Sequence, residues 1–258
     1  MEIASVAVIG SGVMGSGIAQ TLAVAGCVVC CHDIDEAQLE RAAALVEGGR
    51  YGLARAVERG KLAGADAEAA RRRLSFTHVL DEALAGVDLA IEAVPEVLAL
   101  KMEVFGRLDQ AAPPQAILAS NSSGFPVAAL AGATRRPDRV IGWHWASPPP
   151  VMGLAEIVVT DATSEATRDT VVALATAAGK RPVVVRDNAR AWGYVGNRIY
   201  MAALREARAV VEEGIVDPDG VDTILTSGWN WPVGPFAMIR GATEGWGDGH
   251  HSSVGDIT

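Results

Sequence analysis

The chain has 258 residues, half of them hydrophobic, and a formal net charge of −9 at pH 7. This length suits one large hydrophobic core, or a large domain together with a small one. The negative charge argues against general affinity for nucleic acid, although it allows a local basic pocket for a phosphorylated substrate. No stretch has the length and apolarity of a membrane span, and no signal peptide is evident at the start, so we expect a cytoplasmic protein that binds neither membranes nor nucleic acid.

The first element along the chain is a predicted strand, turn and helix. An apolar run, Ile3 to Ile9, leads into Gly10-Ser11-Gly12-Val13-Met14-Gly15, and the helix-like stretch Ser16 to Ala25 follows. In such a turn Gly10 permits the sharp bend, Gly12 lets bare backbone approach a pyrophosphate, and Gly15 lets the helix pack closely on the strand. The N–H groups at the helix start attract phosphates. The pattern predicts a dinucleotide-binding turn.

An acidic residue follows the second predicted strand, Cys27 to Cys31. Asp33 stands where a carboxylate accepts hydrogen bonds from an adenosine ribose and repels a 2′-phosphate, so we expect NAD rather than NADP. The other role open to an acidic residue here, capping the helix that begins at Glu36, suits Asp35 better. The cysteines of this strand, Cys27, Cys30 and Cys31, are expected to be buried thiols, and no metal site is predicted.

The rest of the chain alternates strand candidates with helix candidates, which is typical of a parallel sheet covered by helices on both faces. Glu36 to Arg73 shows two helical patterns, which we interpret as a helical hairpin projecting from the sheet. The further strand candidates are Leu74 to Val79, Asp88 to Val94, Ile117 to Ser120, Val140 to Trp145, Leu154 to Val159 and Pro182 to Val185. The helix candidates are Leu98 to Ala111, Glu165 to Ala178, Arg198 to Glu213 and Val221 to Thr226.

This order predicts an α/β fold with two domains. A Rossmann-type, doubly wound, mostly parallel sheet is expected over residues 1–188, including the hairpin at about 36–73. A small all-α domain for substrate binding and dimerisation is expected over residues 189–258, with the boundary near Asp187 to Arg190, because only helical patterns follow Arg186.

Polar side chains follow several predicted strands at their carboxyl ends, where open α/β sheets bind ligands. Ser120-Asn121-Ser122-Ser123 follows one strand, His144 ends another, and Glu156 lies in the next; Asn197 comes later, in a GxxxNR segment that starts at Gly193. Singly, each has an ordinary interpretation, such as a satisfied histidine, a surface glutamate or a serine-rich turn. Together they favour a catalytic site.

This set, with Trp231-Pro-Val-Gly-Pro-Phe236, resembles the 3-hydroxyacyl-CoA dehydrogenase family, of which the short 3-hydroxybutyryl-CoA dehydrogenases are typical. The resemblance runs from Val6 to about Trp246. It implies an oxidoreductase of fatty acid metabolism that transfers a hydride between NAD and the C3 hydroxyl or keto group of a 3-hydroxyacyl-CoA.

The resemblance also implies roles for individual residues. His144 would be the general base, and Glu156 would fix its tautomer and stabilise the imidazolium. Ser123 and Asn197 would bind the substrate oxygens and orient the reacting carbon. Glu96 and Lys101, with Ser123, would line the nicotinamide ribose.

Other positions bear on the substrate. The basic residues of the predicted hairpin would reach the CoA phosphates or form an ordinary solvated helix face; these are Arg55, Arg59 and Lys61. Ser147 replaces an Asn that the family uses to hold substrate and nicotinamide. The family's helical domain normally continues beyond the position of Thr258, which implies a reduced substrate floor.

Three functions therefore remain open. The first is an NAD-dependent 3-hydroxyacyl-CoA dehydrogenase, the second a dehydrogenase of a small 3-hydroxy acid without CoA, of the carnitine or gulonate type, and the third a nucleotide-binding protein without turnover. A homodimer is expected, because the short helical segment carries many apolar residues. Those residues include Ile199, Ala202, Ala203, Ala207, Val210, Val211, Trp229, Trp231, Phe236, Met238 and Ile239.

Overall fold

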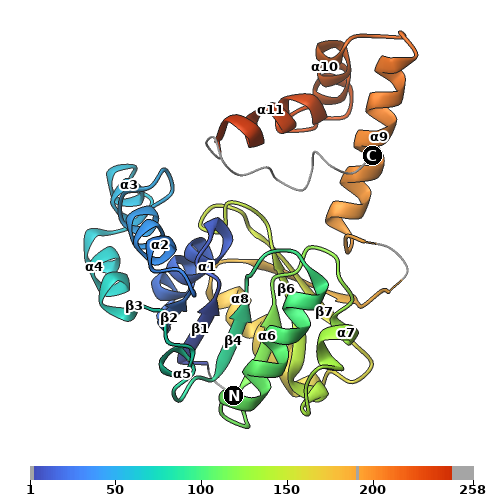
Figure 1. The fold of residues 1–258 in the computed structure, drawn as a ribbon. Coiled ribbons are helices and arrows are strands. Elements are labelled where there is room, and N and C mark those ends of the chain that lie inside the picture. The colour runs from blue at the N-terminus through green and yellow to red at the C-terminus, as the bar shows by residue number, and fades with distance from the viewer. Residues whose placement is uncertain (1–2, 190–191, 246–258) are drawn as a thin grey trace. The chain divides into compact units, whose positions relative to one another are not determined.

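The computed structural model describes residues 3–189 and 192–245 (Figure 1). Two compact units divide the chain, one from Met1 to Tyr194 and the other from Val195 to Thr258. This division lies a few residues after the boundary near Asp187 to Arg190 that the sequence predicts. Residue 190 itself lies outside the described residues.

An eight-stranded sheet forms the first unit, in the order β3-β2-β1-β4-β5-β6-β7-β8. The strands are β1 (Ser5–Ile9), β2 (Val28–His32), β3 (Leu74–Thr77), β4 (Leu89–Glu92), β5 (Ile117–Ser120), β6 (Val140–Trp145), β7 (Leu154–Val159) and β8 (Arg181–Arg186). β1 to β6 pair in parallel, whereas β7 pairs with β6 in the antiparallel sense and β8 runs parallel to β7. The predicted fold class is confirmed.

Helices cover both faces of this sheet (Figure 1). Because strand side chains alternate between faces, Val6 and Val8 belong to one core, while Ala7 and Ile9 belong to the other. The first core is closed by α1 (Val13–Val24), α2 (Glu36–Gly48), α3 (Leu53–Glu58), α4 (Gly64–Arg73) and α8 (Glu165–Ala177). The second is closed by α5 (Leu80–Ala83), α6 (Leu98–Ala111) and α7 (Val127–Ala131), and the 3₁₀ helix η1 (Pro137–Arg139) precedes β6.

Between Glu36 and Arg73 the sequence predicts a two-helix hairpin that projects from the sheet. The structure differs from this prediction. This stretch forms three helices, because α2 ends at Gly48 and the short α3 begins after Gly52. A side chain at Gly52 would meet the carbonyl oxygens of Leu45 and Val46, so the connection is too tight for any residue with a Cβ. Leu53 is fully buried in the same core as α1, which shows that the segment packs on the sheet's helical layer.

The second unit contains α9 (Gly196–Glu212), α10 (Pro218–Gly228) and α11 (Pro235–Gly245). Of the two helices expected from the sequence, Arg198 to Glu213 matches α9 except for its last residue and Val221 to Thr226 lies within α10, whereas α11 was not predicted. Asp222 joins α10 to α11 by accepting hydrogen bonds from the backbone N–H groups of Phe236 at 2.9 Å and Ala237 at 2.8 Å. Residues 246–258 of the expected helical domain lie outside the described residues. Within the described ranges, no helix is long and apolar enough to cross a membrane.

Candidate active site

The order of the strands reverses direction at β1 and β4, which is where doubly wound sheets bind ligands. The glycine-rich turn after β1 lies at this point. Gly10 has a φ of +100°, and a Cβ there would come within 2.7 Å of the carbonyl oxygen of Ala93. A Cβ on Gly15 would overlap the carbonyl oxygen of Gly10. By contrast, a Cβ on Gly12 would meet no protein atom within 4 Å, so space for a phosphate lies against the backbone at the start of α1.

Asp33 ties the carboxyl end of β2 to the glycine-rich turn. Its Oδ2 accepts hydrogen bonds from the backbone N–H of Ser11 at 2.8 Å and the hydroxyl of Ser11 at 3.0 Å. Asp35, as expected from the sequence, caps α2 by accepting the backbone N–H of Ala37 at 2.9 Å. The carboxylate of Asp33 is therefore placed beside the turn, where the adenosine ribose of a dinucleotide is bound in this kind of fold.

A buried ion-pair network lies at the carboxyl end of β4. The ammonium of Lys101 donates to Glu92 Oε1 at 2.6 Å and to the carbonyl of Val94 at 3.1 Å, and lies 3.1 Å from Glu96 Oε2. The side chains of Glu92 and Lys101 are at most 1% exposed. Burial raises the pKa of the Glu92 carboxyl, against the opposing effects of the Lys101 charge and the Ser120 hydroxyl.

The serine-rich turn after β5 completes this network. Glu96 Oε1 accepts hydrogen bonds from the Ser122 hydroxyl at 2.6 Å and from the Ser123 backbone N–H at 2.8 Å. The Ser120 hydroxyl donates to Glu92 Oε2 at 2.6 Å. Three predicted site residues, Glu96, Lys101 and Ser123, are thus brought together. Ser120 and Ser122 belong to the polar turn that the sequence identified, although it gave them no role of their own. Glu92 was not identified, and a charged residue ending the apolar run Leu89–Glu92 was the available signal.

His144 and Glu156 face each other across two neighbouring strands. They are directly paired in the antiparallel register of β6 and β7, and cross-strand pairs of this kind bring side chains into contact. His144 Nδ1 lies 2.7 Å from Glu156 Oε2, with the two side chains 8% and 3% exposed. The pair is therefore largely shielded from water, which strengthens the hydrogen bond.

Two contacts link His144 and the adjacent Trp145 to residues in and just after the serine-rich turn. The ring of Tyr194 packs edge-on against the imidazole, with centroids 5.7 Å apart, and its hydroxyl donates to the carbonyl of Phe125 at 2.9 Å. Burial raises the pKa of Tyr194, so this hydroxyl stays protonated and remains a donor. Asn121 Oδ1 accepts the backbone N–H of Trp145 at 3.0 Å. Asn121 belongs to the polar turn identified from the sequence, whereas Tyr194 was not among the candidates.

Comparison with known proteins shows the family to which this sequence belongs. A model of the 3-hydroxyacyl-CoA dehydrogenase NAD binding domain matches residues 5–188, and a model of the C-terminal domain of the same enzymes matches residues 193–251. The chain belongs to the 3-hydroxyacyl-CoA dehydrogenase family. It is accordingly an NAD-dependent oxidoreductase, and a nucleotide-binding protein without turnover is no longer a supported alternative.

Individual members of the family are similar over most of the chain. A probable 3-hydroxybutyryl-CoA dehydrogenase of Bacillus subtilis is 42% identical over 238 residues, which cover 92% of this chain and 80% of that protein. The crystal structure of (S)-3-hydroxybutyryl-CoA dehydrogenase PaaH1 from Ralstonia eutropha superposes with a TM-score of 0.85 at 36% identity, covering 92% of this chain and 81% of that chain. A 5-formyl-3-hydroxy-2-methylpyridine 4-carboxylate 5-dehydrogenase of Mesorhizobium japonicum is 33% identical, covering 92% of this chain and 75% of that protein.

The other site residues implied by the family resemblance lie in a loop, on and near a surface helix, and in the second unit. Ser147 follows β6, and its hydroxyl is buried without a hydrogen-bond partner in the part of the chain that the structure describes. Arg55 is exposed on α3 and forms an ion pair with Glu58 at 2.7 Å, and Arg59 and Lys61 are exposed just beyond that helix. Asn197 lies in the first turn of α9, in the second unit.

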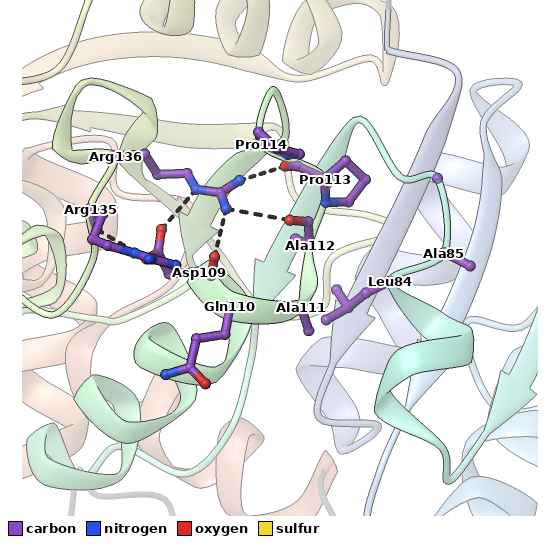
Figure 2. A pocket seen from close by; sticks show the side chains of 11 residues that line it. Leu84, Ala85, Asp109, Gln110, Ala111, Ala112, Pro113, Pro114, Arg135 and Arg136 are labelled. Atoms are coloured by element: carbon purple, nitrogen blue, oxygen red, sulfur yellow. Dashed lines mark hydrogen bonds and ion pairs between the residues drawn. The ribbon is translucent and has the colours of Figure 1, made fainter.

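A surface hollow lies at the amino ends of β4 and β5, at the edge of the sheet opposite the dehydrogenase site (Figure 2). It is lined by the ends of α5 and α6 and by Arg135 and Arg136. Figure 2 shows the Arg136 guanidinium pointing at the end of α6, where it donates to Asp109 Oδ1 at 2.8 Å and to the carbonyls of Asp109 at 2.7 Å and Pro113 at 2.5 Å. The arginine acts as a helix cap here, so the hollow has a structural explanation.

Proposed function

We propose that this family member oxidises the C3 hydroxyl of 3-hydroxyacyl-CoA thioesters, or reduces the corresponding 3-oxoacyl-CoA. The buried His144–Glu156 pair is the observation that carries this proposal. Removing a hydride from a secondary alcohol requires a base for the hydroxyl proton, and an imidazole held by a carboxylate meets that requirement.

The proton step follows from the geometry of the pair. With the proton on Nδ1, the imidazole donates to Glu156 and presents the lone pair of Nε2 to the substrate hydroxyl. As Nε2 takes the hydroxyl proton, the C3–H bond breaks with its electron pair and a carbonyl forms at C3. The carboxylate of Glu156 then stabilises the imidazolium in a site that excludes most water. Ser123 and Asn197 are proposed to bind the substrate oxygens.

The residues around the switch point fit NAD, which accepts the hydride when bound. The open space beside Gly12 and the N–H groups at the start of α1, with Val13 and Met14, suit the pyrophosphate. Asp33 would accept hydrogen bonds from the adenosine ribose hydroxyls, and Glu96, Lys101 and Ser123 would line the nicotinamide ribose; their positions around the glycine-rich turn and the end of β4 support these roles.

Two of the three relatives described above are 3-hydroxybutyryl-CoA dehydrogenases, which supports a CoA thioester as substrate, whereas the name of the Mesorhizobium japonicum enzyme does not include CoA. Oxidation of NADH should therefore be measured with acetoacetyl-CoA and, separately, with acetoacetate and other free 3-oxo acids. We expect kcat/KM to be at least about a hundredfold higher for the thioester, because binding of the remote CoA part orients the reacting carbon. A preference for a free acid would instead favour the carnitine- or gulonate-type alternative, in agreement with the change at Ser147.

Arg55 and Lys61 are proposed contacts of the CoA phosphates in this scheme. Their exposure on and beyond α3 is compatible with that role, and equally with a solvated helix face. The variants Arg55→Gln and Lys61→Gln should raise KM for acetoacetyl-CoA and leave kcat unchanged if the phosphates bind there. An unchanged KM in both variants assigns these residues to the solvated face.

A further inference from the structure

Lys180 is a buried cation with no part in the proposed mechanism. It is 7% exposed and follows α8 at the start of β8. Its ammonium donates to the carbonyl of Pro149 at 2.5 Å and to that of Met152 at 2.9 Å, and it lies 5.2 Å from the ring centroid of Trp145. All three partners are uncharged.

These uncharged partners distinguish Lys180 from Lys101, which is buried against the carboxylates of Glu92 and Glu96. Placing an ammonium in a protein interior costs several kcal/mol, which an opposite charge ordinarily offsets. Burial lowers the pKa of Lys180, in agreement with an environment that supplies dipoles and an aromatic face only. A methionine of similar length would fill the same space without this cost. The hydrogen bonds that the ammonium donates to the two loop carbonyls are therefore the feature to be explained.

Both carbonyls belong to one loop, residues 146–153, which connects β6 to β7. This loop therefore joins the strand of His144 to the strand of Glu156. It carries Ser147, whose buried hydroxyl has no hydrogen-bond partner in the described part of the chain and is thus available to a ligand.

The loop also lies against α1, the helix that begins at the glycine-rich turn. A Cβ on Gly17 would come within 3.0 Å of Pro149 Cδ, which shows how closely the two segments approach. Inside the loop, the backbone N–H groups of Val151 and Met152 both donate to the carbonyl of Pro148 at 3.0 Å. Helix α1 therefore packs against the loop at Pro149, and the Lys180 ammonium holds the carbonyls of Pro149 and Met152.

We propose that Lys180 is a positioning residue of the dehydrogenase site: its ammonium holds the 146–153 loop so that the Ser147 hydroxyl is oriented for substrate or nicotinamide. Lys180 would affect turnover only by orienting Ser147, and this part of the proposal rests on the proposed function. The effect on the loop itself does not depend on the proposed function.

Two variants and a control test this role. Lys180→Met removes the charge and the hydrogen bonds at nearly constant length, whereas Lys180→Gln keeps N–H donors without the charge. Arg181→Gln, at the exposed neighbouring position, removes one positive charge and is the control. Hydrogen exchange at the amides of Val151 and Met152 should be at least about tenfold faster in Lys180→Met, intermediate in Lys180→Gln and unchanged in Arg181→Gln. Exchange at the wild-type rate in a folded Lys180→Met protein would overturn the proposal. If Lys180→Met does not fold, the same comparison with Lys180→Gln decides.

A double-mutant cycle separates positioning from a general structural role. With acetoacetyl-CoA and NADH, we expect kcat/KM to fall by roughly three- to tenfold in Lys180→Met, about as much as in Ser147→Ala, and to fall little further in Lys180→Met with Ser147→Ala, because both changes remove one coupled contact. Losses that simply multiply would show that Lys180 does not act through Ser147. A wild-type protein inactive with every 3-oxo substrate would refute the proposed function, while the exchange measurement would still decide whether Lys180 holds the loop.

Discussion

At the scale of single residues, the hydrogen bond between His144 and Glu156 makes the sharpest prediction about turnover. Replacing His144 by Ala removes the proposed base, so we expect kcat to fall at least about a hundredfold while NAD binding is retained. Glu156→Gln should lower kcat more than it lowers substrate affinity, because the carboxylate stabilises charge that develops during the reaction.

The chain offers a matched control for these two variants. His78 also lies beside a carboxylate, 3.3 Å from Glu36, but that pair is exposed. His78→Ala should leave kcat unchanged. Steady-state rates at saturating substrate, with cofactor binding followed by fluorescence titration, provide the measurements. Unchanged rates in both the His144 and Glu156 variants would remove this pair from the mechanism.

The carboxylate of Asp33 makes a prediction about cofactor choice. Its Oδ2 already accepts two hydrogen bonds from Ser11, which fixes a negative charge beside the glycine-rich turn. A 2′-phosphate there would meet like charge, so NADH should bind more tightly than NADPH, and Asp33→Asn should narrow the difference. Titration of both cofactors against both proteins checks this. Equal affinities of the wild-type protein for the two cofactors would show that Asp33 does not contact the ribose.

Because the Ser147 hydroxyl has no partner in the described part of the chain, we expect Ser147→Ala to have opposite effects on stability and on activity. A buried donor without an acceptor costs free energy, so Ser147→Ala should leave the Tm unchanged or slightly raised. If the hydroxyl forms a hydrogen bond with a bound ligand, kcat/KM of the same variant should fall roughly three- to tenfold, because one hydrogen bond contributes about 1 kcal/mol. Thermal unfolding and steady-state kinetics of the one variant test both statements. A lower Tm with unchanged kinetics would contradict them.

At the scale of elements, the end of α6 depends on Arg136 (Figure 2). Its guanidinium, 12% exposed, donates to the Asp109 carboxylate and to carbonyls that the helix leaves without partners. Arg136→Ala should lower the free energy of unfolding by on the order of 3 kcal/mol, because it leaves a buried carboxylate poorly paired. Arg135 contacts the same carboxylate but is 81% exposed, so Arg135→Ala should cost less than about 1 kcal/mol.

This helix end also carries a pH dependence with a defined sign. Burial raises the pKa of Asp109, but hydrogen bonds from Arg135 and Arg136 outweigh that effect and hold the pKa below its usual range. The stabilisation is therefore present above the ordinary aspartate pKa and is lost as the pH falls through the lowered value. Urea unfolding of the wild type and of Arg136→Ala across the acidic range should show the difference between them shrinking as the pH falls. A difference that stayed constant would assign the effect to the capped carbonyls alone.

At the scale of the whole molecule, the second unit leaves large apolar side chains in contact with water. Ile199 is 67% exposed, Ile224 56% and Trp229 74%. A unit this small buries little apolar surface by itself, and exposed patches of this kind mark contacts between proteins. We therefore expect a homodimer that forms through the helical unit. Light scattering across a dilution series should detect it, and Ile199→Glu should shift it toward monomer. A wild-type protein that stays monomeric and folded at assay concentration would contradict this expectation.

The sequence alone determined the features that depend on short segments. Alternating apolar residues predicted the strands, the glycine spacing predicted the turn after β1, and Asp35 could be recognised as a helix cap, because each of these depends on neighbours along the chain. The motifs also identified His144 and Glu156 as candidates. Where local signals were weak the prediction was wrong or silent, as with the short α3 and the helix after Pro235.

Only the tertiary structure decided which side chains meet. His144 and Glu156 contact each other because β7 pairs with β6 in antiparallel register, and a shift by one residue would turn one of them to the opposite face. The Glu92–Lys101 pair is recognisable only once α6 covers β4, and Lys180 reaches the 146–153 loop only because the end of α8 lies beside it. These contacts join segments that are distant along the chain, and their energy comes from burial and charge, which no local pattern specifies.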